Sequence, residues 1–408
     1  MVNFSRISRQ LSYLPILLLL LASAAHNSQA KTKNEIKTKV YYSPKIELEP
    51  GMVSNKNYPS MDFPQGHVAI KSFDAEIVDQ DYKSVPLTQV YLHHWIVDKY
   101  FQSTLNASLP PIFGNISGVC SGNALIQYFG SGAETRRTRS DVPDPYGIVV
   151  GNPSDAPAGY VEKWLLNVHV IDTRDVVDKL GCLECTCELY NVTRDGNGQP
   201  LPPDYYGGLS CCLDGTRCRM EQGYNKLGGN VTYYLKYTVK YLEWDPTSIV
   251  PVRVFVLDAT DIVTKTNNSQ GIVYQHDCQV EYQVKSCSNS TIDLAKNRCI
   301  DTKSVSFTLP KGGNLVFGFG HQHVGGVGIA LYGQGGRNIC TSIPKYGTGK
   351  RDEPGNEFGY VVGFSTCYPK RGSVKISDGE TLTLVSRYSS VRKHAGVMGL
   401  FNIYLADS

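Results

Sequence analysis

Short runs rich in Val, Ile, Tyr, Phe and Thr recur along most of the chain, and Gly, Pro and Asn separate them. Such runs are typical of β-strands with turns between them. We find no convincing amphipathic helix of about ten or more residues. The expected strands include residues 67–70, 87–97, 164–171, 231–242, 252–257, 280–284, 304–309, 315–323, 360–364 and 397–405. Many short strands of this kind predict an all-β protein with antiparallel sandwich or jelly-roll architecture.

The chain is long enough for more than one folding unit. Of its 408 residues, about 378 follow an expected leader, which is more than one hydrophobic core usually organises. We therefore expect two jelly-roll (β-sandwich) domains, over residues 31–270 and 271–408. Within the first, residues 181–223 hold six cysteines and many Gly, Pro and Asp residues, and we interpret them as a disulfide-rich insertion.

Residues 1–30 have the three parts of a cleavable signal peptide. Arg6 and Arg9 give a basic start, residues 14–25 are apolar, and Ser28-Gln29-Ala30 ends the segment with small residues. The apolar run is too short to span a bilayer, and no later stretch approaches about eighteen uninterrupted apolar residues. We expect a secreted protein without a membrane span, in the apoplast or the lumen of the secretory pathway.

All twelve cysteines follow this leader, and an even number in an exported chain is most simply explained by six disulfides. The candidates are Cys120, Cys182, Cys185, Cys187, Cys211, Cys212, Cys218, Cys278, Cys287, Cys299, Cys340 and Cys367. The Cys-x-x-Cys-x-Cys run in the insertion can also indicate a zinc or redox site. An oxidising compartment favours disulfides over either alternative.

Six Asn-x-Ser/Thr sequons indicate N-glycosylation of exposed loops. They begin at Asn106, Asn115, Asn191, Asn230, Asn267 and Asn289. Removing Arg6 and Arg9 from the 40 basic residues leaves 38 against 37 acidic residues, a net charge of about +1. Nucleic-acid-binding domains carry a much stronger positive charge, so we expect no nucleic-acid partner.

Candidate chemistry lies in the histidines. Residues 315–323 carry Leu, Phe, Phe, His and His at the odd positions, so His321 and His323 are expected to continue the apolar face of a strand. Two imidazoles at i and i+2 on one strand face form a natural metal chelate. The alternative is that both are core residues bonded to carbonyls, because burial of two such rings without partners is costly.

Three other residues could extend this site. His93 and His94 are adjacent, so they can reach one metal only at a β-bulge or a strand end. His169 lies alone in an apolar strand, where a histidine is usually part of the core. Met398 is a thioether that, with two imidazoles, would make a soft, uncharged ligand set suited to Cu(I) rather than to Ca, Mg or Zn. His394 shares its strand parity and is the reserve candidate.

Taken in order, these residues resemble the ligand pattern of the copper type II, ascorbate-dependent monooxygenases, the family of peptidylglycine hydroxylating monooxygenase and dopamine β-monooxygenase. That family has an adjacent His-His pair, a lone strand His, a His-x-His motif and a distal Met. The matching residues here are His93, His94, His169, His321, His323 and Met398.

The resemblance implies two jelly-roll domains that face one another across a wet cleft and hold two coppers per chain, one in each domain, with ascorbate as reductant. The electron-donating site would consist of His93, His94 and His169, and the catalytic, dioxygen-activating site of His321, His323 and Met398. The product would be a hydroxylated small or peptide-like substrate. The peptide-hydroxylating branch has an Arg where this chain has Phe319, so peptidylglycine is not the expected substrate.

Nearly the whole mature chain also resembles the plant stress-up-regulated nodulin family. The likeness is carried by Tyr-Leu-His-His-Trp at 91–95, the cysteine cluster at 182–218 and Gly-His-Gln-His-Val-Gly-Gly at 320–326. This family implies a stress or symbiosis response rather than a mechanism. Two alternatives therefore stay open: a non-catalytic copper-binding extracellular glycoprotein, and an adhesive or carbohydrate-binding β-sandwich whose histidines are core.

Overall fold

The computed structural model describes residues 35–113, 119–120, 128–223, 229–268, 271–287, 299–350 and 352–407. Strands predominate in these ranges, which confirms the all-β prediction, whereas the division into two jelly rolls at residue 270 stays a prediction. The expected signal peptide and the sequons at Asn115 and Asn289 lie outside the described residues. No helix among the described residues is long and apolar enough to cross a membrane.

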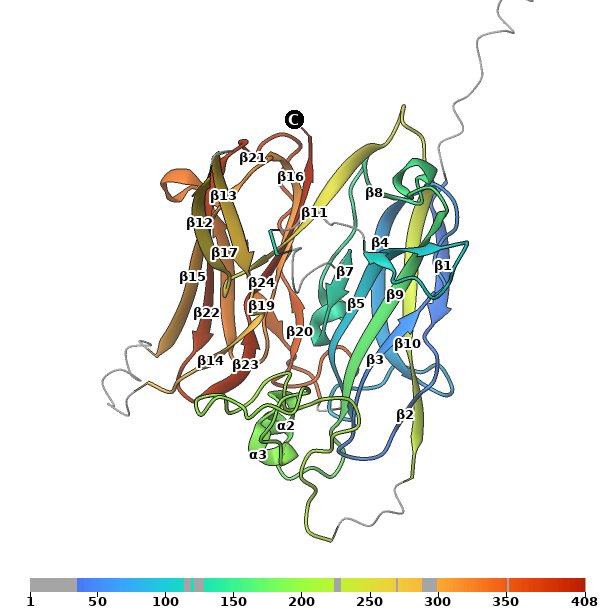
Figure 1. Ribbon diagram of the computed structural model, residues 1–408. Coiled ribbons are helices and arrows are strands. Elements are labelled where there is room, and N and C mark those ends of the chain that lie inside the picture. The colour runs from blue at the N-terminus through green and yellow to red at the C-terminus, as the bar shows by residue number, and fades with distance from the viewer. Residues whose placement is uncertain are drawn as a thin grey trace, which may run out of the picture. The chain divides into compact units, whose positions relative to one another are not determined.

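The largest sheet runs through both halves of the chain in the order β1-β10-β4-β8-β11-β24-β16-β21, with β2 beside β10 (Figure 1). Its strands are β1 (Lys37–Tyr42), β2 (Ile46–Leu48), β4 (Val68–Asp79), β8 (Tyr146–Val150), β10 (Val231–Glu243), β11 (Val250–Asp258), β16 (Gly313–His321), β21 (Lys375–Ile376) and β24 (Leu400–Ala406). β11 joins the two halves, because it pairs in parallel with β8 and antiparallel with β24.

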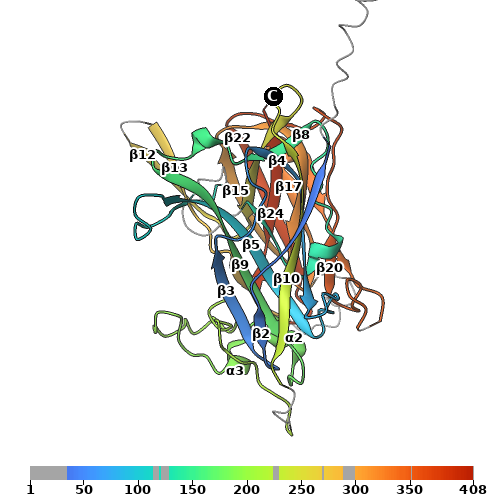
Figure 2. The same cartoon turned by 90° about the vertical axis from the view of Figure 1, so that its right-hand side faces the viewer.

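Two further sheets cover this one. The first has the order β3-β9-β5-β6 with β7 beside β5, and the second has the order β15-β22-β17-β18. Their strands are β3 (Val53–Pro59), β5 (Val90–Ser103), β6 (Ile112–Phe113), β7 (Phe129–Ser131), β9 (Tyr160–Asp172), β15 (Ile300–Leu309), β17 (Gly326–Tyr332), β18 (Asn338–Ser342) and β22 (Glu380–Ser389). In the view of Figure 2, β5 and β9 run side by side.

The remaining elements are short. Three two-stranded ladders consist of β12 (Ile262–Asn268) with β13 (Gly271–Asp277), β14 (Glu281–Val284) with β23 (His394–Met398), and β19 (Pro344–Tyr346) with β20 (Val361–Phe364). The helices are α2 (Lys179–Leu183), α3 (Cys187–Tyr190), and the 3-10 turns η1 (Ala133–Arg137), η2 (Pro153–Asp155) and η4 (Gln334–Gly336). Both α-helices belong to the predicted disulfide-rich insertion.

Aromatic side chains pack the large sheet against the β3-β9-β5 sheet. The ring of Phe73 on β4 stacks on Trp95 of β5 at 4.9 Å, on Phe129 of β7 at 5.0 Å and on Tyr237 of β10 at 5.6 Å between centroids. Each such pair contributes about 0.5–1.5 kcal/mol beyond the burial of apolar area. This packing holds β5 rigidly, and β5 carries two of the candidate histidines.

A second apolar core lies between the other half of the large sheet and the β15-β22-β17-β18 sheet. It includes Leu257 of β11, Phe401 of β24 and Leu384 of β22, all fully buried. One feature of this region differs from the expectation of a single apolar face over 315–323. A register shift between Leu315 and Phe317 turns Leu315 toward the second core and Phe317 toward the first.

The prediction of six disulfides is confirmed, and no described cysteine is free. The pairs are Cys120–Cys278, Cys182–Cys218, Cys185–Cys212, Cys187–Cys211, Cys287–Cys299 and Cys340–Cys367. Three of them close within the insertion, which has little apolar core of its own and depends on these cross-links. The four described sequon asparagines, at positions 106, 191, 230 and 267, are exposed.

Candidate metal centre

A β-bulge brings the adjacent histidines of β5 to the same place. Leu92 pairs with Val170 of β9 and His94 pairs with His169, so His93 is the extra residue of the register shift. A bulge re-aims a side chain that a regular strand would send to the opposite face. One nitrogen from each of His93, His94 and His169 consequently lies within 4.8 Å of the others. The β-bulge that His93 and His94 need in order to reach one metal ion is therefore present.

The His-Gln-His segment lies where β16 ends. Its middle residue is anchored elsewhere, because the Gln322 amide nitrogen donates to the Ser386 hydroxyl at 2.9 Å. The backbone N–H of His323 donates to the Tyr388 hydroxyl at 2.7 Å, and that hydroxyl donates to the carbonyl of Met398, also at 2.7 Å. These bonds fix the turn after β16 and link it to the end of β23.

The two predicted ligand groups form one continuous cluster. The ring of His93 stacks on His169 at 4.5 Å between centroids, and its edge meets the ring of His323 at 4.8 Å. The rings of His321 and His323 are 5.3 Å apart. The resemblance implied two sites separated by a wet cleft, and this separation is wrong for His93 and His323, which are in direct contact.

Several imidazole nitrogens in the cluster have no hydrogen-bond partner. Among the described residues, these are Nδ1 of His93, both nitrogens of His169 and Nε2 of His323; backbone groups of Cys212 and Gly396 act on the pKa of His169 and His323 but make no hydrogen bond of normal geometry to them. The side chains are almost fully enclosed, with exposed fractions of 2%, 0% and 4%. Buried polar atoms are nearly always bonded, because leaving one unpaired costs about 1–3 kcal/mol. The site therefore lacks a partner for three neighbouring rings.

Burial also keeps these histidines neutral. It lowers the pKa of His93 and of His169 well below the ordinary value of a histidine, and the neighbouring imidazoles add to the effect. Burial likewise lowers the pKa of His94 to about 4 and that of His323 to about 3. A neutral ring retains a nitrogen lone pair, which is the form that binds a metal ion.

Asn167 sets the tautomer of His94. Its side-chain oxygen accepts from Nε2 of His94 at 2.8 Å, so this nitrogen carries the proton. The Asn167 amide nitrogen donates to the side-chain oxygens of Asn55 and Asn57, at 3.0 and 2.9 Å, which orients the amide. The free lone pair of His94 is therefore on Nδ1.

Glu134 sets the tautomer of His321. Its carboxylate accepts from Nδ1 of His321 at 2.6 Å, which leaves the lone pair on Nε2. Burial alone would raise the pKa of Glu134, but the His321 ring and the Ser131 hydroxyl lower it to about 2. Gly132 permits this approach, because a Cβ there would lie 2.5 Å from the His93 carbonyl oxygen. Carboxylates commonly orient metal-binding histidines in this way.

A cavity of about 330 Å³ lies beside the cluster. His94, His321 and Met398 line it, whereas His93, His169 and His323 do not. The predicted ligands therefore do not separate into the two expected triads. His94, His321 and Met398 line the cavity, whereas the rings of His93, His169 and His323 contact one another outside its lining. His394, the reserve candidate, does not line the cavity, and its Nδ1 is 2.8 Å from the Glu184 carboxylate in the insertion.

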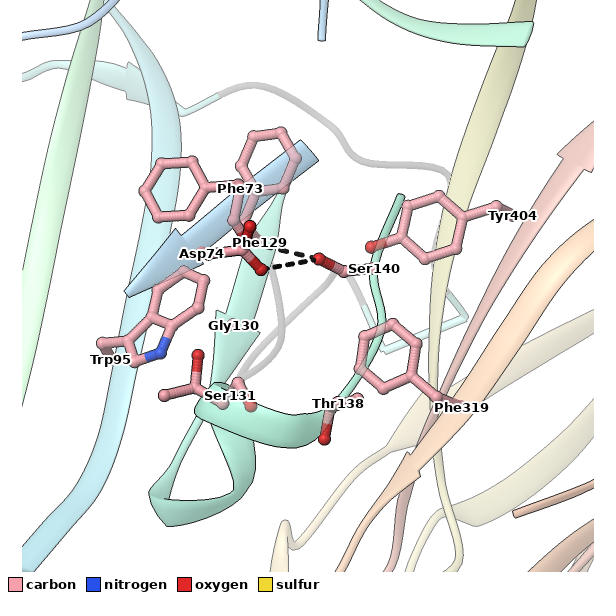
Figure 3. Close-up of a pocket in the computed structure, with 11 residues that line it drawn as sticks. Phe73, Asp74, Trp95, Phe129, Gly130, Ser131, Thr138, Ser140, Phe319 and Tyr404 are labelled. Atoms are coloured by element: carbon pink, nitrogen blue, oxygen red, sulfur yellow. Dashed lines mark hydrogen bonds between the residues drawn. The ribbon is translucent and has the colours of Figure 1, made fainter. Parts of the chain in front are cut away.

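A smaller cavity adjoins the larger one and shares Trp95, Gly130 and Ser131 with it. In Figure 3, Phe73 and Trp95 lie on one side of the η1 segment, and Phe319 and Tyr404 lie on the other. Its volume of about 20 Å³ is sufficient for one water molecule. Phe319, which the resemblance would align with the Arg of the peptide-hydroxylating enzymes, is part of an aromatic wall.

Sequence reasoning missed the residues that hold the histidines in place. Glu134, Asn167 and Tyr388 are single polar residues without a motif, and nothing in the local sequence distinguishes them. The disulfide-rich insertion also borders the site, because the sulfurs of Cys185 and Cys212 lie within 4.8 Å of a His93 nitrogen. Because these sulfurs form a disulfide, they border the histidine cluster and provide no thiolate ligands.

Known proteins resemble this chain to very different degrees. A family model described as stress up-regulated Nod 19 matches residues 34–408. No curated protein matches. The mosquito-larvicidal Cry4Aa toxin of Bacillus thuringiensis is 7% identical, with a TM-score of 0.17, and the alignment covers 83% of this chain and 58% of the toxin chain. The VP2 subviral particle of infectious bursal disease virus is 10% identical, with a TM-score of 0.17 and coverages of 96% and 78%. Scores this low carry no argument about fold or function.

Proposed function

The chain belongs to the stress up-regulated Nod 19 family, and we propose that it is a secreted copper protein that uses ascorbate and dioxygen to hydroxylate a small molecule. One observation carries the proposal. Imidazole nitrogens of His93, His94 and His169 lie within 4.8 Å of one another, and Nδ1 of His93 and both nitrogens of His169 are buried without a hydrogen-bond partner among the described residues. A metal ion would satisfy these unpartnered nitrogens. Neither a hydrophobic core nor a carbohydrate-binding surface requires such a group of imidazoles.

The donor set supports copper over other metals. Neutral imidazoles and the Met398 thioether are soft, uncharged ligands, whereas Mg, Ca and Mn prefer carboxylate oxygens. Bound copper supplies one-electron transfer and the activation of dioxygen. We expect copper in this one cluster, with the two ions per chain that the resemblance implies held by ligands drawn from His93, His94, His169, His321, His323 and Met398.

The cavity supports catalysis over copper storage. His94 and His321 line it, and each has its outer nitrogen fixed by Asn167 or Glu134, so the other nitrogen is pre-oriented. A substrate in this space would lie beside both histidines and Met398. The balanced reaction inserts one oxygen atom of dioxygen into a C–H bond to give C–OH, and reduces the other to water with two electrons and two protons from ascorbate.

Secretion is part of the proposal. Six disulfides require an oxidising compartment for their formation, and all lie beyond the expected signal peptide. Exposed sequon asparagines at 106, 191, 230 and 267 are accessible to glycosylation. The stress-related description of the family suits a protein that acts outside the cell.

Metal analysis gives the first test. Protein purified with its disulfides, stripped of metal and reloaded with Cu(I) should retain about two copper ions per chain. A His67→Ala variant is the matched control, because His67 stacks on Trp244 and lies outside the cluster. Retention of no copper after reloading would contradict the proposal.

Oxygen consumption separates the enzyme from the non-catalytic copper-binding glycoprotein. Copper-loaded protein with ascorbate and a substrate should consume one dioxygen for each hydroxylated product. His323→Ala should abolish product formation, whereas His67→Ala should not. Stable copper binding without product from any small molecule tested would favour the non-catalytic alternative.

A further inference from the structure

Among the described residues that line the 330 Å³ cavity, none is an Asp, Glu, Lys or Arg. Apart from the two histidines, it consists of apolar side chains such as Leu209, Val280 and Leu400, together with amides and small residues. Three acids adjoin the lining without forming part of it: Glu134 is bonded to His321 and Ser131, Glu281 accepts from the Leu209 N–H, and Asp258 accepts from the Val280 N–H. None of the described lining residues therefore offers a counter-ion to a charged ligand.

Two polar groups in this lining have no protein partner. Asn402 on β24 is only 4% exposed, and its side chain makes no hydrogen bond to any described residue. The indole N–H of Trp95, a residue only 3% exposed, is also unpartnered in the described part of the chain. An amide can donate and accept, whereas an indole only donates. A ligand with one or two hydrogen-bonding groups would satisfy the Asn402 amide, whereas the buried indole N–H of Trp95 lies beneath the cavity surface.

We propose that this cavity selects small uncharged molecules, with an apolar body and one or two hydrogen-bonding groups, as substrates of the centre. The selection rests on the proposed function for its chemical outcome, but the binding step requires no metal. A carboxylate or an ammonium group would lose its hydration on entry and find no opposite charge, which is costly. A hydroxyl or amide group loses far less and recovers it from the amide of Asn402 in the lining.

The test compares probes that differ mainly in charge. Metal-free, disulfide-bonded protein is titrated with 4-methylphenol, 4-hydroxybenzoate and 4-hydroxybenzylamine, and with 4-methylcyclohexanol as a second neutral probe, by ligand-observed NMR. At least one neutral probe should bind about tenfold or more tightly than either charged probe. Equal or tighter binding of a charged probe overturns the proposal, and so does failure of both neutral probes to bind.

A change of charge in the lining should reverse the selection. Asn402→Asp is nearly isosteric and should make 4-hydroxybenzylamine the best ligand of the phenol series. Asn197→Asp is the matched control, because Asn197 is exposed in the insertion, and it should change nothing. Leu209→Lys, at a half-buried loop position, should instead favour 4-hydroxybenzoate and remains informative if Asn402→Asp does not fold.

The binding test and the copper test fail independently. Probe binding to metal-free protein is measured before any copper is added, and copper retention is measured without a probe. Neutral selectivity without copper retention would leave the cavity assignment intact and remove the chemistry. Copper retention together with binding of the charged probes would leave the copper centre intact and overturn the cavity assignment.

Discussion

The two groups of histidines in the cluster are held in place by different means. His93, His94 and His169 lie on neighbouring strands, where a single register shift brings them together. His321 and His323 depend on groups from distant elements, the Glu134 carboxylate and the Tyr388 hydroxyl. Three of the six ring nitrogens of the first group are buried without a partner among the described residues, whereas in the second group this holds for Nε2 of His323, and Glu134 orients the His321 ring. The first group should therefore depend on the metal, and the second on its supporting residues.

Removal of His169 should give the largest effect. Among the described histidines, His169 is the one fully buried ring with two unpartnered nitrogens, and His169→Ala deletes it. Metal sites with four ligands provide about 10–16 kcal/mol, so loss of one ligand should weaken Cu(I) binding to this group by roughly 10³-fold. Competition with a Cu(I) chelator measures the change. Copper should also raise the melting temperature of the wild type by more than that of the variant.

The control for this prediction is His276→Ala. His276 pairs with Asp261 through Nδ1 at 2.6 Å and lies outside the cluster. The His276→Ala variant should bind copper as the wild type does. Unchanged affinity in His169→Ala would mean that the unpartnered nitrogens are not ligands.

The second prediction concerns the thioether. Met398→Leu conserves volume, so stability should fall by less than about 1.5 kcal/mol. Copper on the first histidine group should be retained, whereas ascorbate-dependent product formation should fall by more than the roughly 10–100-fold typical of losing an outer-shell contact. Product analysis with parallel copper analysis tests this. Full turnover in the variant would exclude Met398 from the centre.

The third prediction tests the supporting residue of the second group. Glu134→Gln keeps the size of the side chain but loses the charge that fixes His321. Cu(I) affinity of this group should fall about 10–100-fold. Measurement in a His169→Ala background isolates the group. Glu380→Gln, which alters a buried acid bonded to Arg337 away from the cluster, should have no effect on affinity.

The contrast between local strand pairing and contacts from distant elements also explains how much of the structure the sequence could predict. Strand patterns and the cysteine count depend on local composition and compartment, and both predictions are confirmed. The bulge at His93 was a stated condition of the site, because adjacent histidines cannot otherwise share a face. The pairing of Glu134 with His321 spans 187 residues, and no local pattern contains such a contact.

Register shifts caused the other differences. Alternation over 315–323 predicted one apolar face, but the bulge near Val316 divides it between two cores. The expected strand 397–405 likewise divides at Gly399 into β23 and β24. Bulges are set by what packs on each side of a sheet, so a single strand pattern predicts the faces only up to the first shift.

Asp98, on the same strand as His93 and His94, gives the smallest predicted effect and a direct contrast with the histidines. Its Oδ1 is also buried without a partner, but a proton can satisfy it. Burial raises the pKa of Asp98 from 3.8 to about 6. The fold therefore prefers the protonated acid, so the stability that this proton contributes is complete below about pH 4 and is lost as the pH rises through 6.

Asp98→Asn fixes the uncharged state and should remove this pH dependence. The variant should match the wild type at pH 4 and exceed its free energy of unfolding by roughly 2 kcal/mol at pH 7.5. Urea unfolding of the metal-free, disulfide-bonded protein at the two pH values measures the difference, and Asp204→Asn, at an exposed position, is the control. An equal difference at both pH values would show that Asp98 is ionised in the fold. In that case an unpartnered polar atom on β5 tolerates charge without a ligand, and the same tolerance would weaken the case for metal at His93.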